Sequence, residues 1–173
     1  MFDPKNLQWD DIESDYFEGK AYIDHINSMK ERIMHQSNYK AYKPDPEIIR
    51  ELIVFFKESS SKLKILTLGA TWCKTCADVK PSYIKVVEAV DSLKLKVYLL
   101  GGVKTTMTST EDDYTWAQKS PPEFQNPKFF VNQIPIAYFF NHKGDCLTRI
   151  EKYPKNGNSF EESILEIAHN YLI

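Results

Sequence analysis

Two cysteines separated by two residues, Cys73 and Cys76, are the side chains in this sequence best suited to chemistry. Three roles are open to such a pair: a redox-active dithiol, half of a metal site, or two thiols that merely lie close in the chain. In a reducing compartment a close pair is more often catalytic or metal-binding than structural. The third cysteine, Cys146, leaves an odd number, and we expect it to be an ordinary buried strand residue.

The segments on either side of the pair predict how it is positioned. Residues 63–70, LKILTLGA, form a short apolar run typical of a buried strand, and residues 77–93 repeat apolar side chains every three to four positions, as a helix does. The unpaired N–H groups and the dipole at a helix start stabilise a thiolate. We therefore expect Cys73 to be the nucleophile and Cys76, one turn further, to be the thiol that resolves a mixed disulfide.

The other patterns predict an α/β fold with a central mixed sheet flanked by helices. Asp45 and Pro46 open a helix that reaches about Ser59, and LKVYLLGG at 95–102 is a second buried strand. Strand, helix, strand at this spacing indicates a right-handed crossover and a parallel pair. Two later β runs joined around Gly144 form a hairpin, so the sheet becomes mixed, and a capping box at Ser159 opens a closing helix.

Two regions depart from this compact core. Residues 1–45 are predicted to be an N-terminal extension of one or two amphipathic helices, and residues 46–173 to be a single domain with an insertion at about 103–133. A short helix is predicted within the insertion at Glu111 to Lys119. The extension is expected to pack on the core, or to form a weak dimer interface in place of a monomer, through its apolar stripe of Phe17, Ile23, Ile26 and Ile33.

Charge and hydropathy exclude several partner classes. A net charge of −2 with no long basic stripe argues against nucleic acid, and no apolar run reaches the roughly 18 residues that would make a membrane span. The first twenty residues are acidic and lack the basic and apolar regions of an export signal, so we expect a cytoplasmic protein.

Six residues around the dithiol form a combined pattern: Trp72, Cys73, Cys76, Pro81, Ile134 and Pro135. With this pattern the chain resembles the thioredoxin family over roughly residues 46–173. The resemblance implies a thioredoxin-like fold, a cis peptide bond before Pro135, and placement of Pro135 against the dithiol. It also implies a thiol–disulfide oxidoreductase that acts on protein disulfides or dithiols and needs no cofactor or metal. A reductase is one candidate partner for its regeneration, and the regenerating system is left open.

Several residues depart from the thioredoxin pattern, and they leave parts of the expected redox chemistry undetermined. Lys74 and Thr75 replace the Gly-Pro that thioredoxins have between the cysteines, which leaves the redox potential and the direction of reaction undetermined. Thr67 stands where the family buries an Asp thought to handle the proton of the second thiol. Lys80 or Asp78 could take over that role, but we expect residues so early in a helix to be solvated.

Two alternatives to an oxidoreductase remain. The first alternative is a zinc site, because the residue types and spacing of its four nominal ligands match one: Cys73, Cys76, His142 and Cys146. If Pro135 begins its strand beside the dithiol, however, His142 lies roughly 23 Å away at the far end of the sheet. The second alternative is a protein-binding module with little redox activity, which is favoured by the missing Asp and by Glu151 and Lys152 in place of a Gly that lets substrate approach.

Overall fold

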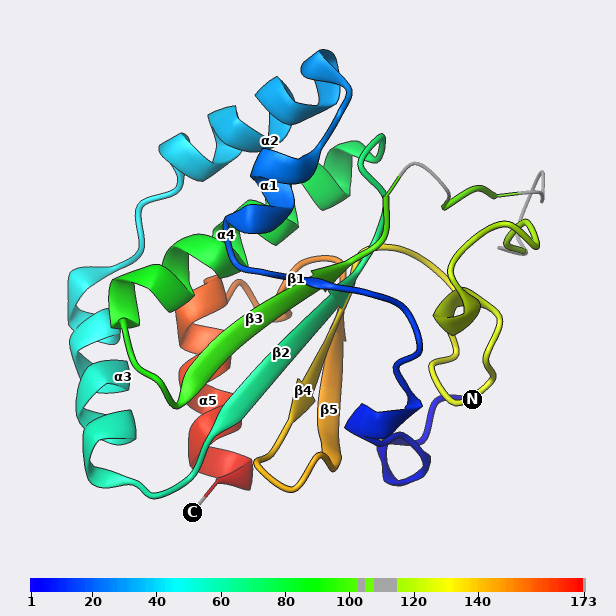
Figure 1. Cartoon of the computed structure of the whole chain (residues 1–173). Helices are drawn as coiled ribbons and strands as arrows, with labels where there is room; N and C mark the ends of the chain where they lie inside the picture. Colours follow the sequence, from blue (N-terminus) through cyan, green and yellow to red (C-terminus); the bar gives the residue numbers. More distant parts are fainter. Residues whose placement is uncertain (103–104, 108–114, 173) are drawn as a thin grey trace.

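The computed structural model describes residues 1–102, 105–107 and 115–172, and these residues form a mixed sheet of five strands flanked by helices (Figure 1). The strand order is β1-β3-β2-β4-β5, in which β2 and β3 are parallel and the other neighbours are antiparallel. The predicted parallel pair and hairpin are thus confirmed. The strands are β1 (Phe17–Glu18), β2 (Leu63–Leu68), β3 (Leu95–Leu100), β4 (Ile136–Phe140) and β5 (Cys146–Glu151).

Three helices, α3 (Pro46–Glu58), α4 (Lys74–Val90) and α5 (Phe160–Tyr171), pack with one face of the sheet. Alternate β2 side chains, such as Ile65, share a cluster with these helices, whereas Leu66 belongs to a second cluster on the other face. Because both faces are covered, the central strands are apolar almost throughout, as the sequence indicated. Residues from the start of the chain and from 116–134 cover the second face.

The N-terminal extension contains α1 (Ala21–His25) and α2 (Met29–Ala41), and it also supplies the edge strand β1, which was not predicted. Phe17 of β1 lies opposite Leu99 of β3. Ile23 and Ile26 are buried as predicted, but Ile33 is 52% exposed, so its predicted core contact is wrong. The extension therefore joins the sheet and the core rather than lying on them as helices alone.

Helix α2 packs along α4 and compensates for the proline inside that helix. Pro81 has no N–H, so the carbonyl four residues earlier, on Ala77, loses its helical hydrogen bond. The side-chain amide of Asn38 donates to this carbonyl at 2.8 Å. The extension thus supplies a hydrogen bond to a backbone carbonyl that α4 itself leaves unpaired.

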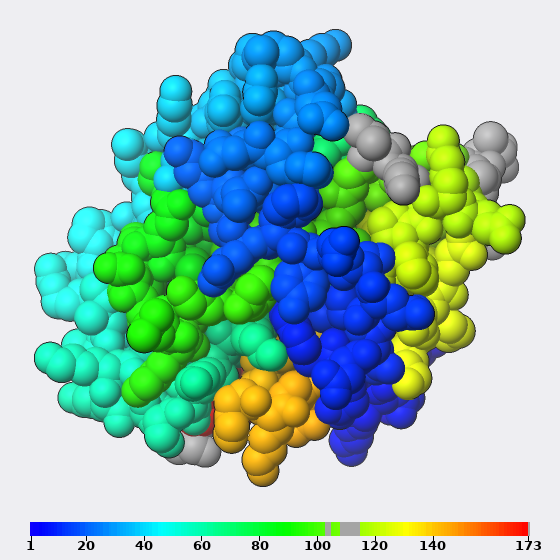
Figure 2. Space-filling model, viewed as in Figure 1, coloured from blue at the N-terminus to red at the C-terminus, as the bar shows by residue number. Residues whose placement is uncertain are grey.

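Residues 115–133 lie beside the beginning of the chain, as the yellow and dark blue atoms of Figure 2 show. The buried carboxylate of Glu123 accepts hydrogen bonds from the backbone N–H groups of Glu13 and Ser14 and from the Ser14 hydroxyl, at 2.6 to 2.9 Å. The helix predicted at Glu111 to Lys119 is absent from 115–119, and residues 108–114 lie outside the described part of the chain. No helix in that described part is long and apolar enough to span a membrane.

Gly69 and Gly101 let two chain segments meet at the carboxyl ends of β2 and β3. Gly101 has φ +110°, and a Cβ there would stand 1.9 Å from the carbonyl oxygen of Gly69. Any side chain at Gly101 would therefore both strain the backbone and force β2 and β3 apart at the edge where the dithiol begins.

Gly101→Ala is expected to lower the free energy of unfolding by at least about 2 kcal/mol, because it combines a disfavoured φ with a direct backbone clash. Urea denaturation monitored by tryptophan fluorescence measures the change. The neighbouring Gly102→Ala is the matched control, since no atom of the described residues beyond its chain neighbours lies within 4 Å of its would-be Cβ. Equal stability of the two variants would contradict this account of the junction.

Candidate functional site

The cysteine pair lies where β2 ends and α4 begins, as the sequence predicted. Cys73 is the N-cap residue of α4, and its sulfur accepts the backbone N–H of Cys76 at 3.2 Å. Cys73 is half-buried, whereas Cys76 is completely buried one turn into the helix. Only the first of the two thiols is therefore accessible to a partner.

The surroundings of Cys73 favour its thiolate. The hydrogen bond from the Cys76 thiol, backbone N–H groups of Cys76 and Thr75, and the charge of Lys80 lower the pKa of Cys73 to about 6, against a burial that acts the other way. A thiol with this pKa is largely ionised near neutral pH. Cys73 is accordingly an activated nucleophile.

The other two thiols are held in their neutral form. Burial, followed by its hydrogen bond with Cys73, raises the pKa of Cys76 far above the ordinary value of a thiol. Burial raises the pKa of Cys146 to about 12, and this residue starts β5 as predicted. The three cysteines thus differ sharply in reactivity, and only Cys73 combines access with charge.

Lys80 is completely buried, so the prediction that it would be solvated is wrong. Its ammonium nitrogen donates to the carbonyl of Leu100 at 3.0 Å and to the hydroxyl of Tyr22 at 3.1 Å, and it lies 4.2 Å from the centre of the Tyr22 ring. A spacing of four residues places Lys80 on the same helix face as Cys76. That spacing was the sequence signal for its burial, whereas nothing in the sequence singled out Tyr22.

Lys80 and Cys76 border one small space. A Cβ built on Gly69 would stand 2.8 Å from the Cys76 sulfur, 2.8 Å from Cε of Lys80 and 3.3 Å from its nitrogen. The absence of a side chain at Gly69 therefore leaves room for both the thiol and the end of the lysine. Thr67 is buried, and its hydroxyl has no hydrogen-bond partner among the described residues.

The residues before and between the cysteines form the exposed rim. Trp72 is 42% exposed and donates its indole N–H to the carbonyl of Thr105 at 2.8 Å, so the described part of the predicted insertion borders the dithiol at Thr105. Lys74 is exposed and Thr75 half-buried. Tyr153, also exposed, donates its hydroxyl to Asp78 at 2.6 Å in the first turns of α4.

Ile134 and Pro135 reach the same edge of the sheet. The bond between them is cis, as predicted, and Ile136, the next residue, lies opposite Leu68 at the end of β2. Ile134 shares a buried cluster with Cys76. The backbone N–H of Lys152 donates to the Pro135 carbonyl at 2.8 Å, and Lys152 adopts φ +57°.

The ligands of the zinc alternative do not meet. His142 lies in the turn after β4, and β4 runs from Ile136 beside the end of β2 to Phe140 beside its start. The turn is therefore at the opposite end of the sheet from the dithiol. Among the residues that the structure describes, no group of three or more His, Cys, Asp or Glu side chains is placed to hold a metal ion.

Neither a protein-family model nor a curated protein sequence matches the chain. Two solved structures resemble it. One is a protein of unknown function from Pseudomonas aeruginosa, with 11% identity, coverage of 90% of this chain and 84% of that chain, and a TM-score of 0.52. The other is an HIV epitope scaffold, with 12% identity, coverage of 88% and 84%, and a TM-score of 0.54. At such identities the likeness concerns the fold alone.

Alkylation of the native protein is expected to modify Cys73 alone, at a rate that rises as the pH passes about 6 and then levels off, because the thiolate is the reactive form. Mass spectrometry of digested protein measures the modification of each cysteine. Labelling in denaturant, where all three thiols react, is the control. Equal native labelling of Cys73, Cys76 and Cys146 would contradict the assignment.

Proposed function

We propose that this protein is a thiol–disulfide oxidoreductase with a thioredoxin-like fold, in which Cys73 attacks and Cys76 resolves. The observation that carries the proposal is the inequality of the pair: an accessible thiol of lowered pKa at a helix start, beside a buried thiol of raised pKa. Thiol–disulfide exchange needs one activated nucleophile and one protected resolving thiol. Two thiols that were merely neighbours would have no reason to differ in this way.

The reaction proceeds in two exchanges. The Cys73 thiolate attacks one sulfur of a partner disulfide, a Cys73–partner disulfide forms, and the other partner sulfur leaves as a thiolate that takes a proton from solvent. Cys76 then loses its proton and attacks the Cys73 sulfur. The Cys73–Cys76 bond forms, the partner's second sulfur leaves and is protonated, and the partner is reduced as the dithiol is oxidised. A regenerating reductase reverses the change in the dithiol.

A protein disulfide is the substrate class that fits the rim of the site. Trp72 and Tyr153 are exposed aromatic side chains on residues close to the reactive sulfur, and the charge of Cys73 is near enough to contribute to the raised pKa of Tyr153. Exposed aromatic residues are common anchors in protein interfaces. The resemblance to thioredoxins adds Ile134 and Pro135 as the backbone against which a bound polypeptide would lie.

The alternative, a binding module with little redox activity, keeps two observations in its favour. Thr67 supplies no carboxylate near the buried thiol, and Lys152 fills the position of a substrate-side Gly. Neither change removes the activated nucleophile or the resolving thiol. We therefore favour the oxidoreductase, and the following experiment distinguishes the two functions.

Cys76→Ser is expected to accumulate a covalent adduct with a synthetic peptide that carries one internal disulfide, because Cys73 still attacks but a serine hydroxyl cannot release the peptide. Mass spectrometry measures the adduct, which reductant should remove. The unchanged protein should instead acquire a Cys73–Cys76 disulfide and release the reduced peptide, and the Cys146→Ser control should behave like it. Trapping by Cys73→Ser would overturn the assignment of roles, and no adduct in any variant would support the binding module.

A further inference from the structure

We propose that Lys80 is the base that removes the proton from Cys76 in the resolving step, with its neutral amine as the acceptor. This inference rests on the proposed thiol–disulfide exchange and names the group that replaces the carboxylate missing at Thr67. The need is plain from the mechanism: a completely buried thiol must become a thiolate before it can attack. Solvent does not reach Cys76, so the acceptor must come from the protein.

The geometry favours Lys80 over the other ionisable groups nearby. Lys80 and Cys76 lie one helical turn apart on one face of α4 and border the same space beside Gly69. Asp78, the other residue considered from sequence, is partly exposed and accepts the Tyr153 hydroxyl instead. Of these two residues, only Lys80 places its ionisable group in the interior beside the Cys76 thiol.

Burial gives Lys80 a proton affinity suited to this task. Desolvation lowers the pKa of Lys80 to about 8, and its interactions with Cys76 and with the Cys73 thiolate act against that decrease. When Cys73 enters a mixed disulfide, its charge disappears, and one of the two influences that hold the proton on Lys80 is lost. The neutral amine thus becomes more populated at the step that needs a base.

The other charged and titratable groups around Lys80 are compatible with this role. Tyr22, on α1, has a pKa raised by burial and stays neutral, so it accepts a hydrogen bond from the ammonium. His35, on α2, is neutral near physiological pH because burial lowers its pKa to about 4. Glu31, also on α2, accepts a hydrogen bond from the Thr71 hydroxyl at 2.8 Å and places a negative charge near Tyr22.

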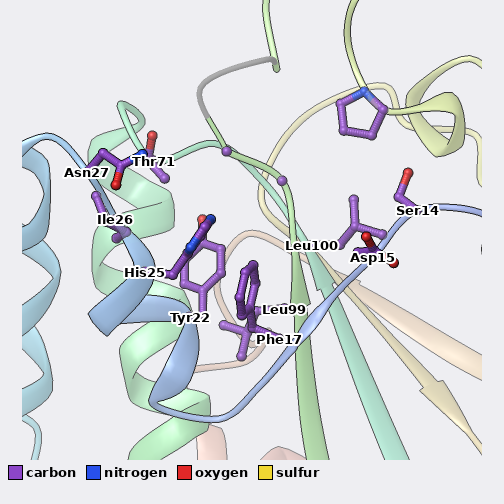
Figure 3. A pocket seen from close by; sticks show the side chains of 13 residues that line it. Ser14, Asp15, Phe17, Tyr22, His25, Ile26, Asn27, Thr71, Leu99 and Leu100 are labelled. Carbon is purple, nitrogen blue, oxygen red and sulfur yellow. The ribbon is translucent and has the colours of Figure 1, made fainter.

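A cavity lined by both hydrogen-bond partners of Lys80 lies beside this group. A cavity of about 240 Å³ is lined by Tyr22, His25, Thr71, Leu100 and other residues of α1, β1 and β3 (Figure 3). Both acceptors of the Lys80 ammonium, the Tyr22 hydroxyl and the Leu100 carbonyl, belong to residues that line this cavity. His25 is exposed, so the cavity reaches the surface. Lys80 does not itself line the cavity, so we route its proton exchange with solvent through the Tyr22 hydroxyl.

The step balances as written. The amine of Lys80 takes the proton of Cys76, and the resulting thiolate attacks the Cys73 sulfur of the mixed disulfide. The Cys73–Cys76 bond forms as the bond to the partner breaks, and the partner thiolate takes a proton from solvent. Lys80 then releases its own proton through the cavity. In the reverse direction, the ammonium of Lys80 returns a proton to Cys76 as the internal disulfide opens.

Lys80→Met tests the proposal in a single turnover with the disulfide peptide, quenched with acid and followed by mass spectrometry of the adduct. Attack by Cys73 should persist, whereas decay of the adduct should slow by roughly 10²-fold near neutral pH, the size of a typical general-base contribution. The rate of decay in the unchanged protein should level off above the pKa of Lys80, which is about 8 in the reduced protein and lower in the adduct. In Lys80→Met the rate of decay should keep rising about tenfold per pH unit, because it then follows the ionised fraction of Cys76, whose pKa is raised by burial.

Three further variants separate this role from a structural one. Lys85→Met, on the same helix, is the matched control, and its adduct should decay as fast as that of the unchanged protein. Lys80→Arg keeps a positive charge that cannot be lost, so its adduct should decay as slowly as that of Lys80→Met. Tyr22→Phe removes one acceptor of the ammonium and should move the levelling of the rate to lower pH, a result that remains decisive if either Lys80 variant fails to fold.

The outcomes distinguish this inference from the proposed function. An unchanged decay rate and pH profile in folded Lys80→Met, or an unshifted profile in Tyr22→Phe, would overturn the role of Lys80 while exchange itself stood. An unchanged protein that forms neither adduct nor internal disulfide would overturn the exchange and the role of Lys80 together.

Discussion

The site is arranged around the burial of one positive charge, the ammonium group of Lys80. A buried ammonium without partners is too costly to persist, so it must find acceptors inside the protein. Here the acceptors come from separate elements: the carbonyl of Leu100 at the end of β3, and the hydroxyl and ring of Tyr22 on α1. Gly69 completes the arrangement by leaving space for the lysine and for the thiol of Cys76. Hydrogen bonds from Cys76 and Thr75 lower the pKa of Cys73, and the charge of Lys80 adds a smaller contribution in the same direction.

This constraint explains why the N-terminal extension is part of the site. Tyr22 reaches Lys80 only because β1 attaches the extension to the edge of the sheet and α1 follows directly. Through Asn38, helix α2 then supplies a hydrogen bond to the carbonyl that lacks a helical partner because of Pro81. Helix α2 also contacts the loop before the dithiol, where a ring nitrogen of His35 lies 3.2 Å from the Thr71 carbonyl oxygen. The residues before position 45 therefore support the chemistry proposed for residues 73 and 76.

Much of the sheet and the placement of the dithiol could be predicted, because both depend on local patterns. Apolar runs predicted β2 and β3, Gly144 predicted the turn of the hairpin, and the apolar repeat after Cys76 predicted α4. The position of Cys73 at a helix start followed from the order of these elements alone.

The parts that could not be predicted depend on contacts between distant segments. Strand β1 has only two residues, too few for a periodic signal, and it exists because β3 offers an edge. Lys80 looked like a surface residue because lysine is seldom buried without partners, and its partners are 58 residues earlier and 20 residues later in the chain. Ile33 was expected in the core because the helical spacing of the extension does not reveal which face meets α4.

The most direct test of the account is the redox equilibrium of the dithiol itself. The purified full chain is incubated with a series of reduced to oxidised glutathione ratios, quenched with acid, alkylated and weighed by mass spectrometry. The account predicts one reversible transition in which two thiols are lost together, with the disulfide mapped to Cys73 and Cys76 and with Cys146 free throughout. Absence of that disulfide at every ratio, or a disulfide that includes Cys146, would contradict it.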